Sequence, residues 1–104
     1  MDDEVFRALA DPSRRRLLDS LNERSGQTLR ELCAGLEMAR QSVSKHLAVL
    51  ERAGLVVRRK TGRTTMCTLA GGPLRGAAAW IEAYRGFWDE RLDGLETYLA
   101  EEEP

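Results

Sequence analysis

The sequence predicts a mainly α-helical domain of about five helices with one small β-hairpin. Two periodicities carry this prediction. Apolar residues recur every three or four positions through most of the chain, as they do on the buried face of a helix. Between about residues 55 and 69 the period shortens to two, around a turn at Thr61-Gly62-Arg63. A length of 104 residues, 42% of them hydrophobic, fits a single domain over residues 1–104 with a modest core.

Two short helices open the chain. Residues 3–10 form the first, and Asp11-Pro12 ends it and begins the second. Aspartate caps a helix through its carboxylate, and proline fits the first helical position. A loop over residues 22–27 follows. The apolar stripes are Val5, Phe6 and Leu9 in the first helix, and Leu17, Leu18 and Leu21 in the second.

The next two helices form a helix-turn-helix unit over about residues 28–53. Thr28 and Glu31 make a capping box at the start of its first helix. The second helix of the unit spans residues 40–53, and Gly54 stands where a positive φ ends a helix most easily. The expected apolar faces are Leu29, Leu32, Cys33 and Leu36, then Val43, Leu47 and Leu50.

A basic hairpin over about residues 55–69 makes the fold a winged helix-turn-helix. Leu55 and Val57 are expected on one face of the hairpin, and Cys67 is expected to pack on the same face as Leu69.

A long helix is predicted over about residues 73–100. The mean spacing of its stripe is near the 3.5-residue period of helices that pack lengthwise on one another. We expect the stripe to pack both on its own domain and on a partner. The stripe consists of Leu74, Ala77, Ile81, Tyr84, Trp88, Leu92, Leu95 and Leu99.

The net charge of −1 conceals a strongly basic middle segment. Residues 1–38 carry six Arg and eight acids, which gives −2. Residues 39–63 carry seven Lys or Arg against Glu51 alone, which gives +6, and residues 64–104 carry three Arg and eight acids, which gives −5. A local basic segment of this kind is typical of proteins that bind a polyanion such as nucleic acid.

Several other functions have no support in the sequence. One His, no nucleophile motif and no Gly-rich phosphate loop indicate that the protein is not an enzyme. No run approaches the roughly 18 apolar residues of a membrane span, and no signal-peptide pattern opens the chain. Two cysteines, Cys33 and Cys67, form neither a disulfide framework nor a C-x-x-C pair. We expect a cytoplasmic protein without a membrane partner or cofactor.

Three stretches carry a family resemblance: VFRALADPSRRRLLDSL (residues 5–21), ELCAGLEMARQSVSKHLAVLERAGLV (residues 31–56) and RRKTGR (residues 58–63). Together they resemble the winged-helix transcriptional repressors of the ArsR type over nearly the whole chain. The second stretch is the specific one, because Ser44-x-His46-Leu47 is close to the recognition-helix signature of that family. Ala39 departs from the pattern, since the family usually has a capping Ser or Thr there, and losing such a cap typically costs about 1 kcal/mol.

Within this family, the chain is similar to the subset that lacks metal ligands. Members that sense metal carry a Cys pair in the third helix, or His and carboxylate ligands on the last helix. The third helix here reads ELCAGL, with Cys33 alone, and the last helix contains no His. Because zinc takes three or four N, S or O ligands, we expect no metal.

The first turns of the helix over residues 40–53 are expected to contact double-stranded DNA, because a helix of this kind enters the major groove in helix-turn-helix proteins. The alternatives are a merely solvated helix face and, for His46, a hydrogen-bonded structural role. The candidates for reading bases are Arg40, Gln41, Ser44 and Lys45, and those for phosphates are Ser42 and His46.

Basic side chains on the wing are expected to reach the DNA backbone or minor groove. Strand alternation sends them to both faces, so only some should touch DNA, with Arg63 as the first choice. Residues 14–16 are three consecutive arginines. They could contact phosphate or could simply keep the surface soluble, and the sequence leaves both alternatives open. The wing candidates are Arg58, Arg59, Lys60 and Arg63.

These features predict a homodimeric repressor that binds a near-palindromic operator, since a dimer places two reading helices about one helical turn apart. The alternatives are a winged-helix module that binds an acidic protein, and a regulator that responds to thiol oxidation at Cys33 or Cys67. The resemblance implies a dimer built by the first and last helices. The interface would comprise Val5, Phe6, Leu9, Leu74, Ala77, Ile81, Tyr84, Trp88, Leu92 and Leu95.

Overall fold

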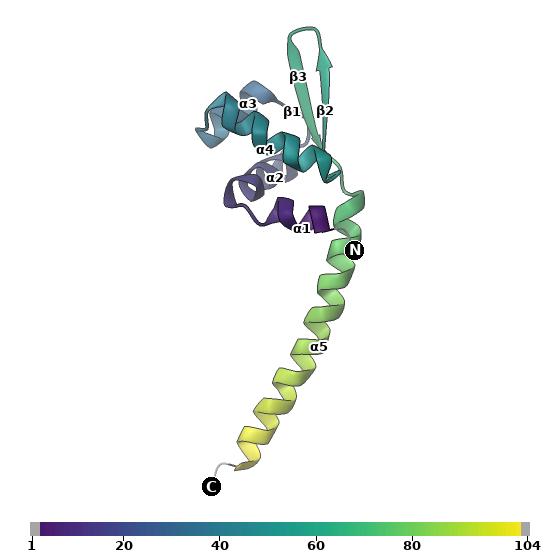
Figure 1. Ribbon diagram of the computed structural model, residues 1–104. Coiled ribbons are helices and arrows are strands. Elements are labelled where there is room, and N and C mark those ends of the chain that lie inside the picture. Colours follow the sequence, from purple (N-terminus) through teal and green to yellow (C-terminus); the bar gives the residue numbers. More distant parts are fainter. Residues whose placement is uncertain (1–2, 103–104) are drawn as a thin grey trace.

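The computed structural model describes residues 3–102, which form five α-helices and three β-strands (Figure 1). The predicted winged helix-turn-helix is confirmed. Glu103, the end of the acidic C-terminal run, lies outside the described residues. The elements are α1 (Asp3–Leu9), α2 (Pro12–Glu23), β1 (Gln27–Thr28), α3 (Leu29–Leu36), α4 (Arg40–Arg52), β2 (Val56–Thr61), β3 (Thr64–Leu69) and α5 (Gly72–Glu102).

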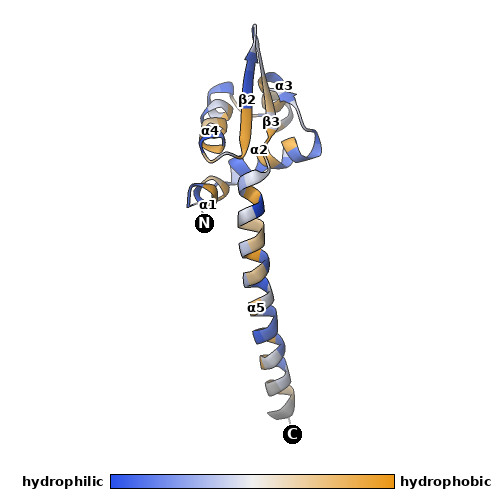
Figure 2. Ribbon diagram, turned by 90° about the vertical axis from the view of Figure 1, so that its right-hand side faces the viewer, coloured by the Kyte–Doolittle hydropathy of each residue, from blue (hydrophilic) through white to orange (hydrophobic). Residues whose placement is uncertain are grey.

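The molecule has a compact body with two projections. Helices α1 to α4 gather at the base of the β2–β3 wing, and the wing and α5 leave this body in opposite directions (Figures 1 and 2). The extents are 71 × 27 × 20 Å, and α5 accounts for the long axis. The two projections therefore stand free on opposite sides of the helix-turn-helix unit.

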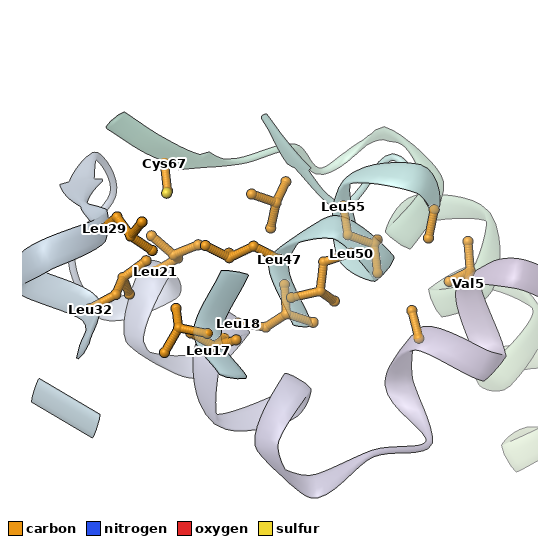
Figure 3. Packing of buried hydrophobic residues seen from close by; sticks show 14 of the residues in the cluster. Val5, Leu17, Leu18, Leu21, Leu29, Leu32, Leu47, Leu50, Leu55 and Cys67 are labelled. Carbon is orange, nitrogen blue, oxygen red and sulfur yellow. The ribbon is translucent and has the colours of Figure 1, made fainter. Parts of the chain in front are cut away.

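The core lies between α4 and the three helices before it. Val43, Leu47 and Leu50 are fully buried on the inner face of α4, as the helical spacing predicts. Figure 3 shows the cluster around Leu47 and Leu50 reaching from Leu29 on α3 to Val5 on α1. Because one stripe of α4 fills the centre of the domain, the opposite face of α4 must point outward.

Local sequence signals set the helix boundaries. The Asp11 carboxylate accepts a hydrogen bond from the Arg14 backbone N–H at 3.0 Å and caps α2. The capping box of Thr28 and Glu31 is present in both directions. Gly54 has φ +79° just after α4, and a Cβ there would lie 3.0 Å from Pro73 Cγ, so this turn requires glycine.

Strand β1 is a short element where the predicted loop over residues 22–27 meets the capping residue Thr28. Gln27 and Thr28 pair antiparallel with Cys67 and Met66, so β3 is the central strand of a three-stranded sheet. The Gln27 side chain is only 5% exposed, and its amide nitrogen donates to the carbonyls of Ser20 and Arg24. A two-residue strand has no period of its own and could not be detected from the sequence.

The pairing of Leu55 with Val57 on one face of the hairpin was wrong. Val56 is buried and Val57 is 39% exposed, whereas Leu55 and Val57 were expected to share a face. The strand begins at Val56, and Leu55 belongs to the turn after α4, where its N–H donates to the Leu50 carbonyl. Leu55 therefore does not share a strand face with Val57, and within β2 Arg58 follows Val56 on the inner side.

Helix α5 contacts its own domain only near its start. Leu74 packs against the core and Ala77 is buried in it. Beyond these residues the stripe is exposed: Trp80, Ile81, Tyr84, Phe87, Trp88, Leu92, Leu95 and Leu99 are each between 45% and 55% exposed. The stripe was expected to pack on its own domain and on a partner. Within the described residues, Leu74 and Ala77 pack on the core, and Trp80 beside them meets the Phe6 ring of α1 with ring centroids 5.9 Å apart.

Replacing Leu47 by alanine tests the central position of α4. We expect the variant to lose about 3 kcal/mol of unfolding free energy, because it deletes a fully buried side chain and leaves a cavity. Urea unfolding at one fixed protein concentration measures the loss. Val57→Ala, on the outer face of the wing, is the matched control and should change stability little. Similar losses in both variants would contradict this core.

The pH dependence of stability tests the Asp11 cap. The hydrogen bond from the Arg14 backbone lowers the pKa of Asp11, with smaller help from the charges of Arg14 and His46. A lowered folded pKa stabilises the protein above the unfolded pKa, and that contribution is lost as the pH falls through the folded value. Wild type should therefore lose more stability between about pH 5 and pH 3 than Asp11→Asn, which keeps a capping oxygen but does not titrate. Parallel pH profiles for these two proteins would refute the assignment.

Candidate nucleic-acid interface

The outer face of α4 presents most of the residues predicted to read DNA. Arg40, Gln41 and Lys45 are exposed on its first turns, while Ser44 is partly buried at the side. Ser42 is also exposed. Within residues 3–102, the Arg40 and Lys45 side chains have no hydrogen bond or ion pair, so their charges are available to a ligand. One exposed helix face thus brings together one amide, one guanidinium and one ammonium group.

The start of α4 lacks a side-chain cap. Ala39 occupies the N-cap position in an extended conformation and makes no side-chain hydrogen bond, as its residue type predicts. The preceding helix, α3, ends at Leu36, and its C-cap residue Glu37 has a left-handed φ of 54°. The turn between the two helices is therefore short, and the first turn of α4 is open to solvent.

His46 lies toward the protein and not toward the open face. Its Nδ1 is 3.8 Å from Asp11 Oδ2, and only 24% of its side chain is exposed. Asp11 is also the cap of α2, so this pair joins the recognition helix to the junction between α1 and α2. The geometry favours the structural role that was the alternative to a phosphate contact.

The wing gives its four basic residues different surroundings. The Arg58 guanidinium donates to Glu51 Oε1 at 3.1 Å, and this hydrogen bond lowers the pKa of Glu51. The pair ties the base of the wing to the end of α4. Arg59, Lys60 and Arg63 are exposed toward the tip, and none has a hydrogen bond or ion pair in the described part of the chain. Arg58 is thus held in place while the other three remain available.

The arginine triplet of α2 has a role that sequence reasoning missed. Arg14 donates to the carbonyls of Arg7 and Ala8, and Arg15 donates to that of Leu9, so both cap the C-terminus of α1. Arg16 donates to the Leu36 carbonyl at the end of α3 at 3.1 Å. Cations at helix C-termini satisfy free carbonyls and complement the helix dipole. No local signal identifies these contacts, because they depend on where α1 and α3 lie in space.

The two cysteines lie in different environments. Cys67 is fully buried in β3, as predicted, and burial raises the pKa of its thiol. Cys33 on α3 is partly buried. Within residues 3–102 there is no group of three or more His, Cys, Asp or Glu side chains arranged to hold a metal ion. In the same range, no helix combines the length and apolar character that crossing a membrane requires.

The residues predicted to form a dimer interface fall into two groups. Val5 is 1% exposed and Ala77 is 4% exposed, so the core of this chain already covers both side chains, and they have almost no surface to offer a partner. Phe6 and Leu9 on α1 and Leu74 on α5 are partly buried against that core. The other members, Ile81, Tyr84, Trp88, Leu92 and Leu95, are exposed on α5.

Comparison with known proteins gives the same architecture. Residues 9–59 match the family description of a helix-turn-helix domain. The chain is 40% identical over 87 residues to an uncharacterised helix-turn-helix transcriptional regulator of Bacillus subtilis, which covers 77% of this chain and 95% of that protein. It is 33% identical over 60 residues to the arsenical resistance operon repressor of Escherichia coli, and this match spans only about half (51%) of that protein.

Solved structures agree with the sequence relatives. The crystal structure of a possible transcriptional regulator for arsenical resistance superposes with a TM-score of 0.72 at 34% identity, over 100% of both chains. An ArsR-like transcriptional regulator from a Rhodococcus species superposes with a TM-score of 0.73 at 33% identity, over 96% of this chain and 91% of that one. Each of these relatives carries a name that describes it as a regulator or repressor, or as a possible regulator, of transcription. With its helix-turn-helix, wing and long last helix, the chain belongs to the ArsR family of transcriptional regulators.

Proposed function

We propose that the protein is a homodimeric transcriptional repressor that binds a near-palindromic operator, including one at its own promoter. The main observation in support of DNA binding is the polar face at the start of α4, where Arg40, Gln41 and Lys45 are exposed beside a basic wing. Repression follows if the operator overlaps a polymerase site. The relative named as the arsenical resistance operon repressor of Escherichia coli supports repression over activation.

The chemistry of the α4 face matches base edges in the major groove. The Gln41 amide can both donate to and accept from adenine, and Arg40 or Lys45 can donate to guanine O6 and N7. Ser44, at the edge of the same face, suits a contact with either base. An acidic protein partner would need the positive charges but not the amide. The presence of Gln41 among the cations therefore favours DNA.

The wing supplies contacts of a different kind. Lys60 and Arg63 are exposed near its tip and have no protein partner within residues 3–102, so we assign them to the DNA backbone or the adjacent minor groove. Arg58 is already bound by Glu51, and its proposed role is to orient the wing relative to α4.

The exposed stripe of α5 supports the dimer. Aromatic rings follow one another along the helix: Trp80 stacks on Tyr84 with ring centroids 5.1 Å apart, and Tyr84 meets Trp88 edge to face at 5.9 Å. Phe6 of α1 meets Trp80 at 5.9 Å and extends the surface onto α1. A monomeric protein seldom exposes so large an apolar surface to water. We therefore propose that the same surface of a second copy of the chain packs against it.

Binding to DNA across a salt series tests base reading. Wild type should bind its own upstream duplex at least about 10³-fold more tightly than a scrambled duplex, with affinity that falls steeply with salt. Gln41→Ala and Lys45→Ala should each reduce that preference, because they remove base contacts. Fluorescence anisotropy provides both affinities.

The same titration can reject the proposal. Glu90→Ala, which removes an exposed side chain from the middle of α5, is the control and should leave the preference intact. No binding to either duplex at low salt would show that the basic face serves a protein partner. An unchanged preference in both α4 variants would show that this face does not read bases.

Charge placed on the α5 stripe tests the dimer. Ile81→Glu combined with Trp88→Glu should give a monomer at about 10 µM, because two carboxylates would have to be buried in the interface. Operator affinity should fall about 100-fold or more, because the two half-sites would then be bound independently. Sedimentation equilibrium measures the mass.

The control carries one new carboxylate on the other side of the helix. Ala79 is exposed and lies about 200° around the helix from Ile81, so Ala79→Glu should remain dimeric. If wild type is itself monomeric at this concentration, or if the double variant stays dimeric, the α5 stripe is not the interface.

A further inference from the structure

Three arginines from three separate elements line one open hollow on the outer side of the domain. Arg30 comes from the first turn of α3, Arg40 begins α4, and Arg63 stands at the turn of the wing. The hollow has a volume of about 590 Å³. Its other lining residues are Thr28, Leu29, Thr64 and Thr65.

These arginines differ from the others that surround the core. Arg14, Arg15 and Arg16 donate to backbone carbonyls of neighbouring helices, as described above. Among residues 3–102, by contrast, Arg30 and the two other guanidinium groups of the hollow have neither a hydrogen bond nor an ion pair, and all three residues are exposed. They therefore keep their full capacity to donate to a ligand.

The protein supplies no counter-charge to this hollow. None of its lining residues is acidic. Glu31, which follows Arg30, is engaged by the Thr28 backbone and hydroxyl and by Arg24, and the hydrogen bonds from Thr28 lower the pKa of its carboxyl. Three positive charges around one hollow repel one another, and an anion bound between them would offset this repulsion. The hollow is therefore arranged for an anionic ligand.

The position of the hollow identifies the anion. It lies between the start of α4 and the tip of the wing, so a DNA strand bound along α4, as the proposed function requires, would run beside it. Guanidinium groups bind phosphate oxygens in pairs of hydrogen bonds, and threonine hydroxyls also donate to them. A row of backbone phosphates fits an open, solvent-exposed hollow of this kind.

We propose that this hollow holds the DNA sugar-phosphate backbone at the edge of each half-site, with Arg30 as a positioning residue on α3. This inference rests on the proposed function, because it requires DNA to lie along α4. It adds to the interface a residue outside both the recognition helix and the wing. It also implies that α3 contributes to affinity but not to sequence preference.

The test compares Arg30→Gln with wild type in a salt titration on the upstream and scrambled duplexes. Loss of a phosphate contact should weaken binding to both duplexes by a similar factor, about five- to tenfold at 0.1 M salt. The slope of log affinity against log salt should become shallower by about one per subunit, and the preference between duplexes should persist. Arg75→Gln is the matched control, since Arg75 is exposed on α5, away from the wing, and should leave affinity and slope unchanged. Equal unfolding midpoints for the two variants would exclude a folding defect.

Two results overturn this inference while leaving the proposed function intact. One is an Arg30→Gln protein with wild-type affinity and slope. The other is a variant that loses preference between the duplexes without a change in slope, which would make Arg30 a base-reading residue. If wild type binds DNA without preference, the proposed operator recognition fails, yet the slope on the scrambled duplex still tests Arg30. If wild type binds no DNA, both proposals are wrong.

Discussion

Burial of the inner stripe of α4 is the constraint on which the interface depends. Val43, Leu47 and Leu50 fill the centre of a core to which α1, α2 and α3 all contribute, so α4 cannot rotate without exposing them. Since side chains on one helix keep fixed angular offsets, this burial also fixes the outward direction of Arg40, Gln41 and Lys45. The hydrophobic core and the exposed polar face of α4 are therefore two consequences of one sequence period. If that face reads DNA as proposed, stability and DNA recognition are coupled through the same helix.

Arginine serves three distinct purposes around this core. On α2 it satisfies carbonyls at the ends of α1 and α3, which holds the helices of the body together without further apolar area. At the base of the wing Arg58 pairs with Glu51 and fixes the hairpin against α4. Around the hollow and at the tip of the wing the guanidinium groups lack protein partners within residues 3–102. An arginine that is bound by other protein groups supports the fold, and an arginine without such a partner is a candidate for the DNA interface. The number of positive charges alone does not make this distinction. The basic segment over residues 39–63 contains members of both sets.

Local signals made much of the fold predictable, and the limits of prediction have a physical cause. The Asp11 cap, the Thr28 capping box and Gly54 each act within a few residues, so the sequence alone locates the helix ends. Strand β1 exists only because β3 lies beside it, and the contact of Arg16 depends on the end of α3, 20 residues further along the chain. The exposed residues of α4 were predictable from period alone. The partner of His46 and the convergence of Arg30 with the wing were not, because both arise from tertiary packing.

In the proposed complex, two copies of α4, held by one dimer, read two half-sites on the same face of DNA. Hydroxyl-radical footprinting of the protein on its upstream duplex tests this most directly, because it maps backbone protection along both strands. We predict two protected patches related by a twofold axis, with centres about one helical turn, or a multiple of one turn, apart. A single patch without a symmetric counterpart would contradict the dimeric arrangement. Uniform protection along the duplex would contradict sequence-specific reading by α4.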